Sequence, residues 1–183
     1  MKDPIDSPWK TLSVKQVYDN PWINLSEAAV INPNGGKGIY GKITFKTKAL
    51  GIVPLDENLN TWLVGQYRYT LGEYSWEIPM GGGPRDGDIL ESAKRELKEE
   101  TGLSAEKWTK LMRIHTSNSV TDEEGFIFLA EQLTQGEQET DDTEKLEIKK
   151  LPLKEAIKMI EQGKITDAIS ISGLLYAHRM LKL

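Results

Sequence analysis

The strongest helix signal in the chain is the stretch DILESAKRELKEETGL, residues 88–103. Asp88 is suited to cap the first turn, Glu91 follows three residues later as in a capping box, and Gly102 comes just after the last turn. At about 100° per residue, three apolar residues fall on one side of such a helix: Leu90, Ala93 and Leu97. The stretch therefore predicts an amphipathic helix over Asp88–Thr101 that packs on a core.

The charges of this predicted helix crowd its second half. Like charges one turn apart repel, and the helix dipole disfavours anions near the C-terminal end, yet Glu96, Glu99 and Glu100 all lie there. Glu96 and Glu100 also fall beside the apolar stripe, where a carboxylate needs a counter-ion. Oxygen ligands spaced in this way suit Mg²⁺ or Mn²⁺, particularly when a phosphate completes the coordination shell. The alternative interpretation is a solvated acidic helix balanced by Lys94, Arg95 and Lys98.

The rest of the chain alternates short apolar runs with turn residues. These runs predict strands at residues 12–18, 22–30, 39–47, 50–55, 61–69, 75–80, 110–116, 125–132 and 146–151. Two further helical patterns cover residues 153–162 and 167–181. Strands mixed with three helices predict a mixed α+β (α/β) sandwich. We expect an N-terminal strand unit, residues 1–48, and a larger domain, residues 49–183.

Composition excludes several function classes. The 183 residues contain no cysteine and two histidines that are far apart, so disulfide frameworks, zinc sites and cysteine nucleophiles are poor hypotheses. A net charge of −5 argues against a nonspecific binder of nucleic acid or of an anionic membrane. The sequence has neither a signal-peptide pattern nor an apolar run of about 18 residues, so we expect a cytoplasmic protein.

The helix and the glycines before it resemble the Nudix box, G-x5-E-x7-R-E-U-x-E-E-x-G-U, in which U is a bulky aliphatic residue. Gly81 and the run Arg95–Leu103 match eight of the nine defined positions. The departure is Gly87, which stands where the box has glutamate; Asp86 and Asp88 flank it and could substitute. Outside the box, five segments resemble the branch of ADP-ribose and nucleoside diphosphate sugar pyrophosphatases: residues 20–22, 32–35, 66–68, 75–79 and 163–168.

The resemblance implies a fold and a metal site. The fold would be a Nudix-type α/β/α sandwich with a small N-terminal antiparallel sheet. The metal ligands would be Glu96, Glu100 and the backbone carbonyl of Met80, with Mg²⁺ as the cofactor and Mn²⁺ as a possible substitute. Arg95 would orient Glu99 or another carboxylate of the cluster. The reaction would be attack of a metal-activated water on a pyrophosphate, giving a nucleoside monophosphate and a sugar phosphate.

The resemblance also implies a catalytic base in the acidic loop Thr134–Lys145. We choose Glu144, because its position just before a predicted strand fixes its backbone best. The next candidates are Asp142 and Glu139. The alternative interpretation is that this loop only keeps the protein soluble.

Substrate contacts are expected from three further residues. Arg68 and Glu77 resemble residues that contact the diphosphate and the nucleoside or sugar, although Arg68 could equally be a surface partner of Glu73. Trp22 could stack on a base, but a tryptophan in a small sheet more often packs in a core or at a dimer interface.

The substrate expected from the resemblance is ADP-ribose or a UDP- or GDP-sugar, without preference for one base or sugar. Two other functions stay open: a Nudix-fold sensor that binds a nucleotide sugar without cleaving it, and a hydrolase of nucleoside triphosphates. The small N-terminal sheet carries much apolar surface, so we expect a homodimer that covers it. The apolar residues on this sheet are Trp9, Trp22, Ile23, Leu25 and Tyr40.

Overall fold

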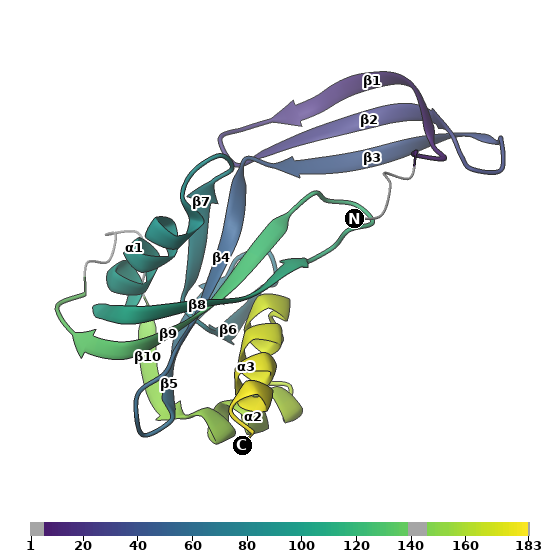
Figure 1. Cartoon of the computed structure of the whole chain (residues 1–183). Helices are drawn as coiled ribbons and strands as arrows, with labels where there is room; N and C mark the ends of the chain where they lie inside the picture. The colour runs from purple at the N-terminus through teal and green to yellow at the C-terminus, as the bar shows by residue number, and fades with distance from the viewer. Residues whose placement is uncertain (1–5, 139–145, 183) are drawn as a thin grey trace. The chain divides into compact units, whose positions relative to one another are not determined.

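The computed structural model describes residues 6–138 and 146–182, and the chain divides into two compact units (Figure 1). The N-terminal unit contains the residues up to Thr47 together with Ser117–Glu123. The larger unit contains Lys48–Thr116 and the residues from Glu124 onward. The boundary expected at residue 48 did not include the second segment of the N-terminal unit.

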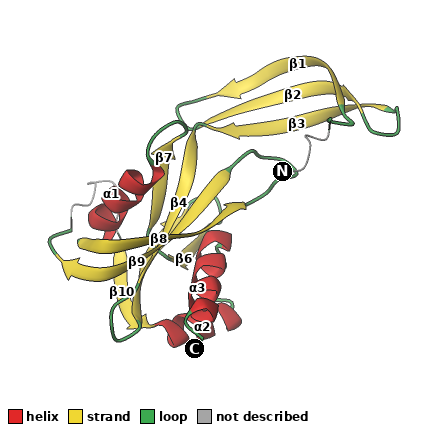
Figure 2. Ribbon diagram, in the orientation of Figure 1, coloured by secondary structure: helices red, strands yellow, loops and turns green. Residues whose placement is uncertain are grey.

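The N-terminal unit is an antiparallel sheet in the order β1-β2-β3 (Figure 2). Its strands are β1 (Lys10–Asp19), β2 (Ile23–Ile31) and β3 (Lys37–Phe45). The β2–β3 turn is organised by Asn32, whose side-chain oxygen accepts hydrogen bonds from the backbone N–H groups of Asn34 and Gly36, both at 3.0 Å. Gly35 has φ 85°, which a glycine adopts without strain. The three predicted N-terminal strands are therefore confirmed.

Residues 117–123 join the N-terminal unit through backbone and side-chain contacts with β3. The Ile43 N–H donates to the Val120 carbonyl at 2.9 Å. The Asp122 carboxylate accepts from the Phe45 N–H at 3.0 Å and lies 3.1 Å from Lys42 Nζ. These contacts link residues nearly eighty positions apart, which local sequence patterns do not register.

The larger unit contains two sheets in the described residues, in the orders β10-β5-β6 and β7-β4-β9-β8. The strands are β4 (Thr47–Pro54), β5 (Asn60–Arg68), β6 (Glu73–Glu77), β7 (Met80–Pro84), β8 (Leu103–His115), β9 (Glu124–Gln135) and β10 (Glu147–Pro152). The helices are α1 (Ile89–Thr101), α2 (Leu153–Glu161) and α3 (Ala168–Met180). The strand β8 is longer than the sequence predicted and carries a bulge between Lys110 and Met112.

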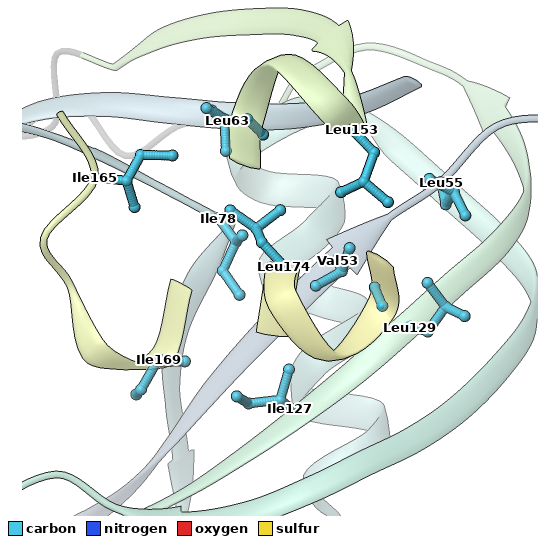
Figure 3. Close-up of a cluster of buried hydrophobic side chains, with 12 residues drawn as sticks. Val53, Leu55, Leu63, Ile78, Ile127, Leu129, Leu153, Ile165, Ile169 and Leu174 are labelled. Atoms are coloured by element: carbon cyan, nitrogen blue, oxygen red, sulfur yellow. The ribbon is translucent and has the colours of Figure 1, made fainter. Parts of the chain in front are cut away.

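Alternating residues of β4 and β9 point to two separate cores. One core, drawn in Figure 3, lies against α2 and α3 and contains Val53, Ile127, Leu129, Leu153 and Leu174. The other lies against α1 and contains Leu50, Ile52, Ala93, Leu97, Phe126 and Phe128. The parallel pairing of β4 with β9 aligns Leu50 with Phe126 and Val53 with Leu129, so each face is continuous across both strands. Helices thus cover both faces of these strands, and the predicted mixed α+β sandwich is confirmed.

Both ends of helix α1 are capped by the residues that the sequence predicted. Asp88 Oδ1 accepts from the backbone N–H groups of Leu90 at 2.8 Å and Glu91 at 3.3 Å. Gly102 has φ 72° and its N–H donates to the Lys98 carbonyl at 2.8 Å. No helix in the described part of the chain is long and apolar enough to cross a membrane.

Candidate active site

Glu96 lies directly over the bare backbone of Gly81. A Cβ atom added to Gly81 would be 2.1 Å from the carboxyl carbon of Glu96, so only glycine allows this approach. Gly81 lies on strand β7, at the edge of its sheet. The side chain of Glu96 is only 13% exposed, and burial raises the pKa of its carboxyl group despite the neighbouring Arg95.

Arg95 holds two carboxylates of the same helix. Its Nη2 lies 2.5 Å from Glu96 Oε1, and its Nη1 lies 2.5 Å from Glu99 Oε2. Nη2 also donates to the Gly82 carbonyl at 3.2 Å, which joins the helix to β7. This guanidinium offsets the repulsion between the two glutamates.

Glu100 is buried, with 6% of the residue exposed, and it faces the start of β7. Its Oε2 accepts a hydrogen bond from the Met80 N–H at 2.9 Å. A buried carboxylate gains from such a bond because the backbone N–H replaces a lost water. Glu96 and Glu100 are thereby brought to adjacent residues of β7, namely Gly81 and Met80.

The carboxylates of α1 and the start of β7 are suitable ligands for a divalent cation. Within the described ranges, no three Asp, Glu or His side chains already meet in a metal-binding cluster. The donor chemistry nevertheless matches a hard cation, because Glu96 and Glu100 are carboxylates one helical turn apart, one against the backbone of Gly81 and the other against that of Met80. Glu96, Glu100 and the Met80 carbonyl are the residues that would hold it.

A second charged group lies on the neighbouring sheet. Arg68 of β5 and Glu77 of β6 form a two-pronged ion pair, in which Nε donates to Oε1 at 2.9 Å and Nη2 contacts Oε2. The Glu77 side chain is 4% exposed and that of Arg68 is 35% exposed. The hydrogen bond to Glu77 is the main cause that raises the pKa of Arg68, and the charges of Asp167 and Glu100 add to it. Arg68 is therefore held mainly by Glu77.

The start of α3 supports the segment between Glu77 and Met80. Ser170 Oγ accepts from the Ile78 N–H at 3.0 Å, and the Ser170 N–H in turn donates to Asp167 Oδ2 at 2.7 Å. Neither Asp167 nor Ser170 was predicted from the sequence as a site residue. An aspartate just before an apolar run is a helix-cap signal, and that signal could have located the start of α3 but not its contact with Ile78.

Two family models match the chain. The one described as the NUDIX domain matches residues 45–170, and the one described as the nucleoside diphosphate sugar hydrolase N-terminal domain matches residues 9–43. The chain belongs to the Nudix family. The resemblance drawn from Gly81 and Arg95–Leu103 is thereby confirmed, and the N-terminal sheet coincides with the second match.

The similarity to individual Nudix proteins covers most of the chain. It is 31% identical over 169 residues to the ADP-ribose pyrophosphatase of Bacillus subtilis, with 91% of each chain covered. It is 31% identical over 173 residues to the ADP-ribose pyrophosphatase of Mycobacterium tuberculosis, covering 93% of this chain and 83% of that one. A crystal structure of ADP compounds hydrolase has the same fold, with a TM-score of 0.85, 24% identity, and coverage of 95% of this chain and 94% of the other. Nudix hydrolases generally use a divalent metal ion, which agrees with the donor set described above.

The departure from the Nudix box at Gly87 has a local structural reason. The Gly87 N–H donates to the Pro84 carbonyl at 3.2 Å, closing a turn before α1. A Cβ atom on Gly87 would lie 2.3 Å from Pro84 Cγ, so a glutamate there would displace this turn.

The remaining predicted residues lie elsewhere. Trp22 belongs to the N-terminal unit and is 69% exposed, so it is not part of a core in that unit. Glu144, Asp142 and Glu139 lie outside the described residues. The described beginning of their loop is attached to the end of α1, since Gln138 Nε2 donates to the Glu100 carbonyl at 2.7 Å.

Proposed function

We propose that this Nudix hydrolase cleaves the pyrophosphate bond of nucleoside diphosphate sugars such as ADP-ribose, UDP-sugars or GDP-sugars. The products are a nucleoside monophosphate and a sugar phosphate. The observation that carries the proposal is the arrangement of Glu96 and Glu100 at Gly81 and Met80. The two ADP-ribose pyrophosphatases that cover most of the chain support the same substrate class.

Each residue of the site has a separate task. Glu96, Glu100 and the Met80 carbonyl hold Mg²⁺, for which Mn²⁺ can substitute. Mg²⁺ supplies charge that lowers the pKa of water and neutralises phosphate oxygens. Arg95 orients Glu96 and Glu99, because its guanidinium contacts both.

Arg68 binds the diphosphate. It is one-third exposed and fixed by Glu77, so it can present a positive charge to an anion at little cost in side-chain entropy. No long basic tract occurs in the sequence, which favours a diphosphate over a triphosphate chain.

The catalytic base is Glu144. The support for this assignment is the anchoring of Gly136 and Gln138 at the end of α1, where the Gly136 N–H donates to the Gly102 carbonyl at 2.8 Å and Gln138 contacts Glu100. The described start of the loop is therefore attached to the end of the helix that bears the proposed metal ligands. A stacking contact between Trp22 and the base stays a prediction. A cytoplasmic location stays a prediction.

Product analysis tests this function. Purified protein with ADP-ribose and Mg²⁺ should release AMP and ribose 5-phosphate in equal amounts, and chelation of the metal should stop the reaction. The variant E100Q should lose at least about a hundredfold in kcat, since it removes a metal ligand. Binding of ADP-ribose without any cleavage by the wild type would instead favour a nucleotide-sugar sensor.

A further inference from the structure

We propose that Glu77 is a positioning residue, which fixes the guanidinium of Arg68 for the diphosphate and does not itself contact the substrate. The inference rests on the proposed function and differs from the expectation that Glu77 contacts the nucleoside or sugar. It starts from the geometry of one ion pair on the β5–β6 hairpin.

Both carboxylate oxygens of Glu77 are engaged by Arg68. Oε1 accepts from Nε at 2.9 Å and Oε2 contacts Nη2, which is the parallel two-bond geometry of arginine and carboxylate. Within the described residues, Glu77 is the hydrogen-bond partner of this guanidinium, and Nη1 has none. The edge that contains Nη1 is thus the part of Arg68 that can receive an anion.

Arg68 pairs with a carboxylate that is not its direct cross-strand neighbour on the hairpin. In the β5–β6 register, Arg68 lies directly opposite Glu73, while Glu77 lies opposite Val64. Arg68 nevertheless reaches back along the strands to the buried Glu77 instead of pairing with the exposed Glu73. A carboxylate that is 4% exposed needs such a fixed partner, and it has little surface left for a substrate hydroxyl group.

Other carboxylates compete for the same guanidinium. Glu100 and Asp167 both attract Arg68, as the rise in its pKa indicates. Without the two bonds from Glu77, the guanidinium would lose the contacts that fix its orientation on the hairpin. Glu77 therefore keeps the positive charge oriented toward the position of the diphosphate.

The test is a set of steady-state measurements with ADP-ribose, UDP-glucose and GDP-mannose. The variant E77Q keeps the shape and one oxygen acceptor but loses the two-pronged ion pair. Because the diphosphate is common to all three substrates, E77Q should raise KM about tenfold for each, while kcat changes by less than about threefold. In an R68M background, the added E77Q substitution should change kcat/KM by less than about twofold.

A matched control is E124Q, which breaks the Arg113–Glu124 pair between β8 and β9. It should leave KM and kcat unchanged. Melting temperatures of all variants establish that they are folded. R68M could fail to fold because it leaves the buried Glu77 unpaired. The comparison of the three substrates then still tests whether Glu77 contacts the base or sugar, since it needs only the E77Q variant.

Three results would overturn the inference. In one, the KM rise in E77Q differs more than about fivefold among the three substrates, as direct contact with a base or sugar requires. In another, E77Q lowers kcat/KM as much in the R68M background as in the wild type. In the third, E77Q behaves as the wild type. If the wild type cleaves none of the three substrates, the proposed function itself fails, a result distinct from these.

Discussion

At Gly81, one added methyl group would occupy the place of the Glu96 carboxylate, because the distance to its carboxyl carbon would be 2.1 Å. The variant G81A should therefore displace Glu96 and weaken Mn²⁺ binding at least about tenfold, as expected for a lost carboxylate ligand. The strand itself tolerates alanine, so the melting temperature should change little. Calorimetric titration with Mn²⁺ measures the effect.

The matched control for G81A is G41A on β3, where an added Cβ would meet no atom within 4 Å. It should bind Mn²⁺ as the wild type does. Equal affinity in G81A and the wild type would contradict the assignment of Glu96 as a ligand.

Asp56, in the β4–β5 turn, links stability to pH. Burial raises the pKa of its carboxyl group, but the hydrogen bonds from Lys150 and Asn60 outweigh burial and lower the pKa from 3.8 to about 2. Its stabilising contribution is therefore full above pH 3.8 and is lost as the pH falls through about 2. We expect D56N to cost about 1–2 kcal/mol near neutral pH and less at pH 3. Urea unfolding at the two pH values measures this difference, and an equal cost at both would refute the linkage.

At the scale of one element, the proposed metal ligands on α1 are expected to lower the stability of the helix when no metal is bound. The ionised Glu96 is disfavoured by burial and by the charge of Glu99, although Arg95 offsets part of this. Without metal, E96Q should thus melt at the same or a higher temperature than the wild type, while its turnover falls at least about a hundredfold. The control E91Q changes an exposed acid on the same helix, which pairs with Lys94, and should retain turnover. A clear fall in the metal-free melting temperature of E96Q would identify Glu96 as structural.

The sequence predicted helix α1 well, because its capping residues and its apolar face depend only on residues that are close in the chain. Asp88 and Gly102 mark its ends in the sequence and in the structure. The run Gly81–Gly83 did not signal a strand, because glycine has low β propensity and β7 forms through pairing with β4. The Arg68–Glu77 pair was also not predicted, since it depends on the register of two strands. Spacing could bring Glu96 and Glu100 together, but it could not reveal that a glycine makes room for one of them.

At the scale of the whole molecule, the N-terminal sheet exposes large apolar side chains. Trp9 is 43% exposed, Val14 64% and Ile39 73%. Ile23 and Leu25, which were also expected on this surface, are partly buried. Such a surface favours a symmetric partner, so light scattering at micromolar concentration should give twice the chain mass of 20.6 kDa. A mass equal to that of a single chain would refute the homodimer.

The central claim is that the site prefers a diphosphate joined to a sugar. Its most direct test is kcat/KM measured for ADP-ribose, UDP-glucose, GDP-mannose and the nucleoside triphosphates at one Mg²⁺ concentration, because this ratio reports discrimination in the transition state. We predict that a nucleoside diphosphate sugar ranks first, at least about tenfold above every triphosphate. A triphosphate at the top of the ranking would contradict the account.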